Sequence, residues 1–442
     1  MRKTVFFGRL ENIGEESVKT CSPFFYFFQN IRWICALLST YLLLSPPLSA
    51  KLPKKKLKRL LQRYNQAVRY ENIPKMASLL EQLAEDNSLR MAKLILKVAV
   101  SYDHPRIYRS CLFALRKFNH PKAKAYLHSK LKNGTPPQQI ILMEAFQFQK
   151  GKEYTPKYIE KLRSSNPSIL RLAVEILAKR QDPSAIPALI QLLEKQQKRK
   201  RQGLLYFEIR KALHRLTGQD FLTPQEWKQY WQQRKKKSSP YARTVVRQIQ
   251  KKGPRFFTET VVSDRVVFII DISASMEEKD PYQGGENSSP SSNTPSNLPN
   301  SRMRIERAKN QLIQVISQLP PAAYFNIIAF NDKAYYWSPR MKKASTSRKS
   351  AIQWVRQLRP KGLTATYAAL KQAFHNKKAD TFYLLSDGEP TVGPGTGEIL
   401  DFVFKQNRFR KIKIYTMGFP GANRQFMATL ATNNGGKYSD IR

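Results

Sequence analysis

The spacing of apolar residues divides the chain into two parts with different patterns. From about Leu57 to Trp231, apolar residues recur three and four positions apart, and short breaks carrying Asn, Pro, Gly or Asp separate these stretches. This pattern is typical of amphipathic helices joined by tight turns. After about residue 255, continuous apolar runs of strand length alternate with helical stretches. The sequence therefore predicts an all-α region followed by an α/β domain.

The helical region is internally repetitive. Displacing the sequence by about 31 residues aligns Pro105 with Pro136 and Pro167, and it also aligns apolar positions in both halves of the unit. The aligned apolar sets are Cys111, Leu142 and Ala173; Leu115, Phe146 and Leu177; Leu127, Tyr158 and Leu189; and Leu131, Leu162 and Leu193. Because a single helix pair cannot bury its apolar face alone, units of this length are expected to stack into a solenoid.

One stretch of this region, DPSAIPALIQLL at residues 182–193, combines an Asp-Pro turn with regularly spaced Ala and Leu. In this stretch the chain resembles the HEAT-repeat family, and the resemblance extends over about residues 70–235. A divergent last unit follows it. There Thr223 and Glu226 match a capping box with Pro224 at the first helical position, which predicts a final helix with Trp227 and Trp231 on one face.

The second part alternates strands and helices. Strands are expected at residues 265–271, 323–330, 381–387 and 411–419, and helices at residues 304–319, 349–358, 367–374, 398–406 and 424–432. Regular alternation of this kind indicates a parallel sheet with helices on both faces. In such sheets the ligand site lies at the carboxyl ends of the strands.

Side chains with oxygen donors gather at this edge. Asp271 ends the first strand and is followed by Ser273 and Ser275, Asp387 ends another strand, and Thr364 lies on a loop just before a helix. Taken singly, Asp271 is better explained as a helix cap or a solvated strand end. Together, two carboxylates and three hydroxyls from three loops form a set of hard donors, which suits six-coordinate Mg²⁺ or Mn²⁺ and does not suit zinc.

This pattern closely resembles the von Willebrand factor A domain and its metal-ion-dependent adhesion site. The family's ligand positions are matched by Asp271, Ser273 and Ser275 for the Asp-x-Ser-x-Ser motif, by Thr364 for the threonine loop, and by Asp387 for the last aspartate. The resemblance implies a doubly wound, Rossmann-like α/β fold. It also implies that the hydroxyls bind the metal, that the two aspartates act directly or through water, and that a partner's carboxylate fills an open position.

The resemblance runs from about Phe256 to the C-terminus. It includes the closing LATNNGGKYSDI, where such domains end with a helix, a Gly-Gly turn and a last strand. Leu363 is a small departure, because many members carry a second Gly before the threonine. It lies outside the ligand set.

The charge is strongly basic and uneven. The chain has 77 Lys and Arg against 32 Asp and Glu, and residues 51–254 alone hold 45 basic and 14 acidic side chains. The densest runs are residues 51–59, 195–201 and 234–237. Such a surface biases the chain toward acidic partners such as nucleic acid, anionic lipid or anionic polysaccharide, but solvated faces and linkers that bind nothing explain the basic runs more simply. No base-reading motif is present in the sequence.

The N-terminal residues form a candidate leader. Arg32 precedes an apolar run from Ile34 to Leu44, and SPPLSA follows it, which is typical of a secretory signal peptide cleaved after Ala50. An uncleaved membrane anchor that includes the earlier aromatic run FFYFF, and a wrongly assigned start, are the alternatives. The sequence thus predicts an extracytoplasmic protein, which is periplasmic, secreted or associated with the cell envelope.

The cysteines lie on both sides of the predicted cleavage site. Two of the three, Cys21 and Cys35, lie in the leader, so the processed chain would hold only Cys111 and could form no internal disulfide. Cys111 lies in a helical pattern and is predicted to be a small buried core residue.

These patterns give a domain plan. The plan is a signal peptide or anchor at 1–50, HEAT-like repeats at 51–238, a linker at 239–254 and the von Willebrand A domain at 255–442. A disordered insertion at 277–302 is expected inside that last domain, because the segment is rich in Ser, Asn, Pro and Gly. The insertion is either a tolerated surface loop or one that selects partners.

No enzyme is predicted from the sequence. No Ser-His-Asp order or phosphate-binding loop occurs, and the five histidines are scattered at His104, His120, His128, His214 and His375. The leading interpretation is an exported adhesion module that captures an acidic residue of a partner protein through Mg²⁺ or Mn²⁺. The alternatives are an acidic polymer bound by the basic repeats, and an assembly subunit of a chelatase-like machine, against which the leader argues. A membrane contact is expected only if the N-terminal segment is uncleaved.

Overall fold

The computed structural model describes residues 51–198, 203–236, 249, 251, 253–280 and 302–441. Several sequence-based predictions lie outside these residues: the leader with Cys21 and Cys35, most of the linker at 239–254, the end of the basic run 195–201, and residues 281–301 of the expected insertion. The ends of that insertion are described and paired, because Asp280 N donates to Arg302 O at 3.1 Å. Within the described residues, no helix is long and apolar enough to cross a membrane.

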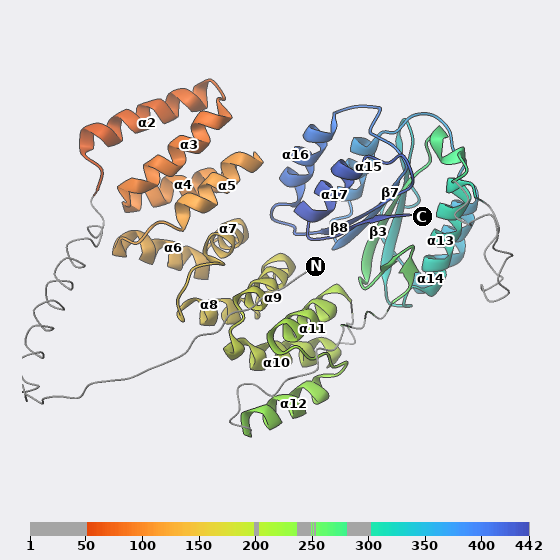
Figure 1. Ribbon diagram of the computed structural model, residues 1–442, viewed down its shortest axis with the longest axis horizontal. Coiled ribbons are helices and arrows are strands. Elements are labelled where there is room, and N and C mark those ends of the chain that lie inside the picture. Colours follow the sequence, from red (N-terminus) through yellow and green to blue (C-terminus); the bar gives the residue numbers. More distant parts are fainter. Residues whose placement is uncertain are drawn as a thin grey trace, which may run out of the picture. The chain divides into compact units, whose positions relative to one another are not determined.

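The first part of the described chain consists of helices. They are α2 (Lys54–Arg69), α3 (Ile73–Leu83), α4 (Leu89–Ser101), α5 (Pro105–Leu115), α6 (Pro121–Asn133), α7 (Pro136–Phe146), α8 (Tyr154–Lys161), α9 (Pro167–Arg180), α10 (Ile186–Lys198), α11 (Leu204–Thr217) and α12 (Pro224–Lys236), with short 3₁₀ turns η1 (Ala84–Asp86) and η2 (Pro183–Ala185). In Figure 1 successive helix pairs follow one another from α2 to α12. This arrangement confirms the predicted all-α region.

The 31-residue repeat has a direct structural basis. The prolines that align in the sequence are the first residues of α5, α7 and α9, where the missing N–H breaks no helical hydrogen bond. All twelve aligned apolar positions are buried. The first helices of the units pack in series, α5 on α7, α7 on α9 and α9 on α11, so that neighbouring units share one apolar core. The capping box of the last unit is also present, since Glu226 N donates to Thr223 Oγ1 and Thr223 N to Glu226 Oε2.

The second part is an α/β domain. Its strands are β1 (Arg255–Phe256), β2 (Glu259–Thr260), β3 (Arg265–Asp271), β4 (Tyr324–Phe330), β5 (Ala334–Tyr336), β6 (Lys342–Lys343), β7 (Thr381–Ser386), β8 (Lys413–Gly418) and β9 (Tyr438–Asp440). Its helices are η3 (Ala274–Glu277), α13 (Arg304–Gln318), α14 (Ala344–Arg356), α15 (Thr366–Phe374), α16 (Thr396–Asn407) and α17 (Arg424–Asn433). The main sheet has the order β5-β4-β3-β7-β8-β9, and β6 also pairs with β4.

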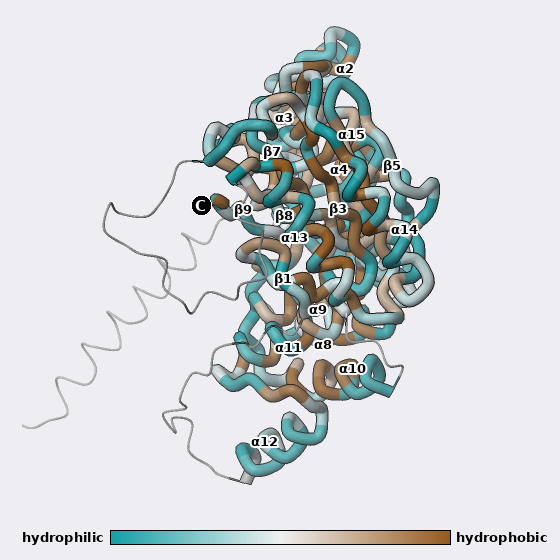
Figure 2. Tube along the Cα trace, turned by 90° about the vertical axis from the view of Figure 1, so that its right-hand side faces the viewer, coloured by the Kyte–Doolittle hydropathy of each residue, from teal (hydrophilic) through white to brown (hydrophobic). Residues whose placement is uncertain are grey.

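The sheet lies between two layers of helices. Buried residues of α13 and α14 form a core with one face of the strands, and those of α15, α16 and α17 form a core with the other face. Figure 1 shows these two groups on opposite sides of β3 and β7. In Figure 2 hydrophobic stretches gather around β3, whereas α12 is largely hydrophilic. The doubly wound α/β class predicted from the sequence is therefore confirmed.

The sheet differs from the prediction at its edge. The central strands β4, β3, β7, β8 and β9 are parallel, as expected, but β5 and β6 pair antiparallel with β4. These two edge strands have only three and two residues, and their side chains are largely exposed, so no apolar run marks them in the sequence. The helix α14 also begins five residues earlier than expected, at Ala344.

The helical repeats contact the α/β domain at the amino ends of the strands. Arg171 of α9 donates from Nη2 to the carbonyl oxygens of Arg410 and Lys411 at 3.2 and 3.0 Å. Arg408, which follows α16, donates to the Val100 carbonyl of α4 at 3.1 Å and to the Tyr102 carbonyl. Because β8 begins at Lys413, these contacts lie at the edge opposite the carboxyl ends of the parallel strands.

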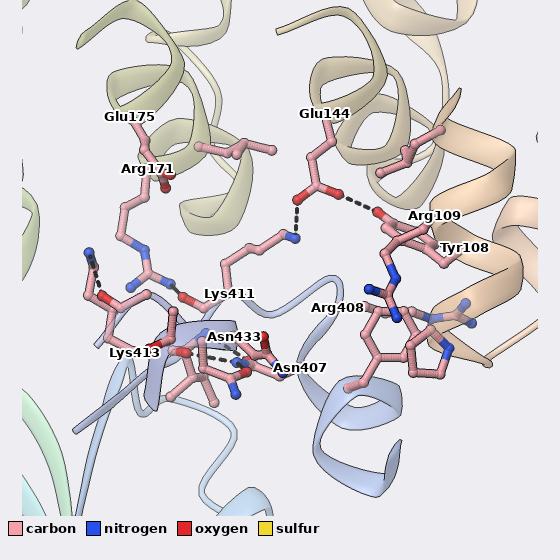
Figure 3. Close-up of a pocket in the computed structure, with 18 of the residues that line it drawn as sticks. Tyr108, Arg109, Glu144, Arg171, Glu175, Asn407, Arg408, Lys411, Lys413 and Asn433 are labelled. Carbon is pink, nitrogen blue, oxygen red and sulfur yellow. Dashed lines mark hydrogen bonds and ion pairs between the residues drawn. The ribbon is translucent and has the colours of Figure 1, made fainter. Parts of the chain in front are cut away.

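A cavity of about 720 Å³ lies at this junction. Two ion pairs in its lining cross the junction: Lys411 with Glu144, and Lys413 with Glu208 at 2.8 Å. Figure 3 shows Glu144 between Lys411 and Tyr108, whose hydroxyl donates to Glu144 at 2.5 Å. Because ion pairs cross it, the cavity forms part of a polar interface between the repeats and the α/β domain.

Candidate metal site

The carboxyl edge of the sheet positions the candidate ligands. Asp271 is the last residue of β3, and its neighbour Phe330 is the last residue of β4. On the other side of β3, β7 ends at Ser386, one residue before Asp387. Parallel pairing therefore brings the two predicted aspartates to the same edge of the sheet.

Hydrogen bonds join four of the five predicted residues. Ser273 N donates to Asp271 Oδ1 at 2.9 Å, the Ser273 and Ser275 hydroxyl oxygens lie 3.2 Å apart, and Ser275 Oγ donates to Asp387 Oδ1 at 2.9 Å. Ser273 precedes the short 3₁₀ helix η3 but makes no side-chain capping hydrogen bond. The side chains of this motif thus face each other across the edge, and Ser273 does not act as a cap.

Thr364 is held beside this group by its loop. Ala274 N donates to Gly362 O at 2.9 Å, which ties the loop to the segment between Ser273 and Ser275. Thr364 N donates to Thr391 Oγ1 at 2.9 Å, beyond the end of β7. A Cβ atom added to Gly388 would lie 3.7 Å from Thr364 Oγ1. The threonine hydroxyl therefore lies against the residue that follows Asp387.

The two aspartates are buried, and burial affects the pKa of both. Asp271 is fully buried and Asp387 nearly so. Burial raises the pKa of Asp271 to about 7, although hydrogen bonds from Ser386 and Ser273 oppose this shift. Burial also raises the pKa of Asp387, against hydrogen bonds from Ser275 and Arg304. A cation placed among these oxygens would offset the cost of burying the two charges.

The chemistry of the donors fits a hard divalent cation. All the candidate side chains offer oxygen, and three of the five are uncharged hydroxyls. In the part of the chain that the structure describes, no cluster of three or more His, Cys, Asp or Glu side chains is suited to a metal. At this site the hydroxyls would therefore have to supply part of the coordination.

Two residues of the site were not predicted from the sequence. Ser386, the last residue of β7, donates its hydroxyl to Asp271 Oδ2 at 2.5 Å. Arg304, the first residue of α13, donates from Nη1 to Asp387 Oδ2 at 3.0 Å. The sequence gives no clear signal for Arg304, because a basic residue at a helix N-terminus is only mildly unfavourable, and α2 also begins with lysines and has no acid in its first turn.

The α/β domain is a von Willebrand factor type A domain. The family model for the von Willebrand factor type A domain matches residues 299–440, which include Thr364 and Asp387. Asp271, Ser273 and Ser275 precede the matched range. Among the preceding helices, α9 and α10 contain a HEAT-like repeat, since the model for the PBS lyase HEAT-like repeat matches residues 169–195.

Two relatives match part of the chain. Human von Willebrand factor A domain-containing protein 3B is 32% identical over 143 residues, which cover 31% of this chain and 11% of that protein. Pig inter-alpha-trypsin inhibitor heavy chain H1 is 26% identical over 197 residues, which cover 41% of this chain and 19% of that protein. The chain thus spans less than a fifth of the length of these relatives.

A solved structure also matches only part of this chain. A von Willebrand factor type A protein from Catenulispora acidiphila matches with a TM-score of 0.32 and 20% identity, over 41% of this chain and 40% of that chain.

Proposed function

We propose that this chain is a protein-binding module that captures an acidic side chain of a partner through Mg²⁺ or Mn²⁺. Ser273, Ser275 and Thr364 would hold the metal with their hydroxyls, and Asp271 and Asp387 would act directly or through ordered water. The observation that carries this proposal is the hydrogen-bonded chain from Asp271 through the two serines to Asp387. A bound divalent cation would supply the positive charge that attracts the partner's carboxylate.

The donor set favours an acidic partner for a physical reason. Hydroxyls lower the positive charge of a metal less than carboxylates do, and the two aspartates are the only acids in the proposed set. A divalent cation held in this way retains charge, and ordered neighbours keep its ligands oriented. Both oxygens of Asp271 already accept hydrogen bonds, from Ser386 and from the Ser273 amide.

The repeats are proposed to serve as a scaffold. Their contacts lie at the amino ends of the strands, whereas the proposed metal site lies at the carboxyl ends. Leu363, next to Thr364, is 54% exposed, so the rim of the site includes an accessible apolar side chain. We also propose that the protein is exported, because its N-terminal residues resemble a leader. We propose a non-enzymatic role because the site resembles an adhesion site.

Metal binding by the full chain tests the proposal. Isothermal titration calorimetry should detect weak Mg²⁺ or Mn²⁺ binding, and Asp271→Ala should abolish it while the circular dichroism spectrum stays unchanged. Glu389→Ala is the matched control, since this exposed acid lies two residues from Asp387 and outside the cluster. It should alter the affinity by no more than about twofold, as expected for an exposed charge in high dielectric. Unchanged binding in Asp271→Ala would refute the site.

One observation favours a second candidate, acidic-polymer binding by the repeats. The helix α2 contains no acidic residue, and it exposes a row of basic ones at Lys54, Lys55, Lys56, Lys58 and Arg59. The two functions respond differently to salt, because polymer binding releases counterions and weakens steeply as salt rises. A metal bridge is short-ranged and should survive moderate salt.

Capture of partners from a cell-envelope extract separates the two candidates. Metal-bridged capture should be lost in EDTA and in Thr364→Ala, and it should fall only modestly between low and physiological salt. Charge reversal in the basic run 195–201 should then change the association rate more than the final affinity. Capture that ignores EDTA and collapses with salt would assign the function to the basic repeats.

A further inference from the structure

Arg304 brings a fixed positive charge to the proposed site. It is the first residue of α13 and its side chain is 8% exposed. The guanidinium contacts three carboxylates, with Nη1 3.0 Å from Asp387 Oδ2, Nε 2.9 Å from Asp280 Oδ1, and Nη1 2.7 Å from Glu278 Oε2. Of these three acids, only Asp387 belongs to the proposed ligand set.

The position of this arginine is held by several independent contacts. Arg304 N donates to Glu278 O at 3.0 Å, and Asp280 N donates to Arg302 O at 3.1 Å, so the start of α13 is paired with the segment after η3. The side chain also donates to the Ser275 carbonyl at 3.4 Å. A forked guanidinium can bond two carboxylates in fixed directions, which a lysine cannot do. Arg304 is therefore restrained at both its backbone and its side chain.

The contact with Arg304 restricts how Asp387 can coordinate a metal. Its Oδ1 accepts from Ser275 Oγ at 2.9 Å and its Oδ2 accepts from Arg304 Nη1 at 3.0 Å, so both carboxylate oxygens are already engaged. A hydroxyl hydrogen turns aside easily, because it rotates about the C–O bond. The guanidinium keeps its charge and is restrained by Asp280 and Glu278. Direct coordination by Asp387 would therefore have to compete with a charged partner.

We propose that Arg304 is a positioning residue that holds Asp387 away from direct contact with the metal and partly neutralises it. The inference rests on the proposed metal-binding function. Its consequence is a site that binds its divalent cation less tightly than the ligands alone would allow. The bound cation correspondingly keeps more of its positive charge for the partner's carboxylate.

Mn²⁺ alone is a sufficient probe of this role in the full chain. Electron paramagnetic resonance of free Mn²⁺ gives the affinity, and water proton relaxation gives the number of water ligands on the bound ion. Removing a positive charge beside the site in Arg304→Gln should tighten Mn²⁺ binding about tenfold. Direct coordination by the released Asp387 should also displace about one water ligand of the bound ion.

Arg307→Gln is the matched control. Arg307 lies on the same helix and pairs with the other oxygen of the same Asp280, Oδ2, whereas Arg304 bonds Oδ1 and also Asp387. This variant also removes one positive charge, and it should change the affinity by no more than about twofold and leave the water count unchanged. If it tightens binding as much as Arg304→Gln does, general charge explains the effect and the positioning role is wrong.

Mn²⁺ binding by Arg304→Gln, by Arg304→Lys and by the wild-type chain gives the remaining tests. Equal or weaker Mn²⁺ binding by Arg304→Gln with an unchanged water count overturns the inference. If that variant does not fold, Arg304→Lys decides, because it keeps the charge but cannot bond Asp280 and Asp387 with separate nitrogens. Tightening by about two- to threefold then supports the role, and no tightening overturns it. Absence of Mn²⁺ binding in the wild-type chain would instead reject the proposed function itself.

Discussion

Replacing Arg171 with alanine should loosen the von Willebrand A domain from the repeats. This arginine extends from α9, is buried, and donates to the carbonyl oxygens of Arg410 and Lys411 at 3.2 and 3.0 Å. A third, longer contact of 3.5 Å reaches the Asp380 carbonyl. Alanine would leave these backbone acceptors without their charged donor.

The size of the effect follows from the number of contacts. A hydrogen bond from a charged donor contributes about 1.5–3 kcal/mol, and two of the three contacts have good distances. Ser168 also donates to the Arg410 carbonyl at 2.8 Å, and this bond would remain in the variant. We therefore expect Arg171→Ala to cost about 3 kcal/mol of the free energy that couples the two parts.

Differential scanning calorimetry measures this coupling. If the two parts unfold together in the wild-type chain, the variant should show two transitions, or one at a lower temperature. Lys179→Ala is the control, because Lys179 lies on the same helix but pairs with Glu175 in a partly exposed i,i+4 contact. Such pairs are worth about 0.3–0.5 kcal/mol, so this variant should be nearly neutral. Equal effects of the two substitutions would refute the reasoning.

Two further predictions concern packing. Burial raises the pKa of the Cys111 thiol to about 12, so Cys111 should resist iodoacetamide in the folded chain and react only after unfolding. Peptide mapping distinguishes its labelling from that of the two cysteines before residue 50. Rapid labelling of Cys111 under native conditions would contradict its burial. Gly436→Ala should lower stability to urea by about 1–3 kcal/mol, because its Cβ would lie 1.9 Å from the Ile414 carbonyl oxygen. Gly397→Ala is the control, since nothing lies within 4 Å of its added Cβ, and equal losses would show that the close approach is relieved.

The strands that carry the candidate ligands could be located from the sequence because they are central. The run RVVFIID is buried on both faces, and β3 occupies all seven of its residues, with Asp271 at the end. The helical repeats were predictable for a similar reason, since prolines recur at the first position of α5, α7 and α9. In both cases a local pattern is repeated or uninterrupted, so it stands out without knowledge of distant contacts.

The residues that sequence reasoning missed depend on distant contacts. Arg304 is separated from Asp387 by 83 positions, and the two meet because α13 begins at the edge where β7 ends. The junction with the repeats is similar, because Arg171 contacts Lys411 across 240 positions and neither residue stands out among so many basic ones. Long-range pairing of charges leaves no periodic signal along the chain. The metal-binding role of the five matched residues stays a prediction.

One strand connects the two edges of the domain. The chain enters β7 directly after Asp380, whose carbonyl faces Arg171, and leaves it directly before Asp387. Six residues of extended chain, about 20 Å, therefore separate the anchorage on the repeats from the proposed capture site. A partner pulling on that site would load β7 along its length, so that the hydrogen bonds to β3 and β8 on either side would resist in shear and share the force. Mechanical tension would thus pass from partner to scaffold through the centre of the sheet, and the short edge strands β5 and β6 would carry little of it.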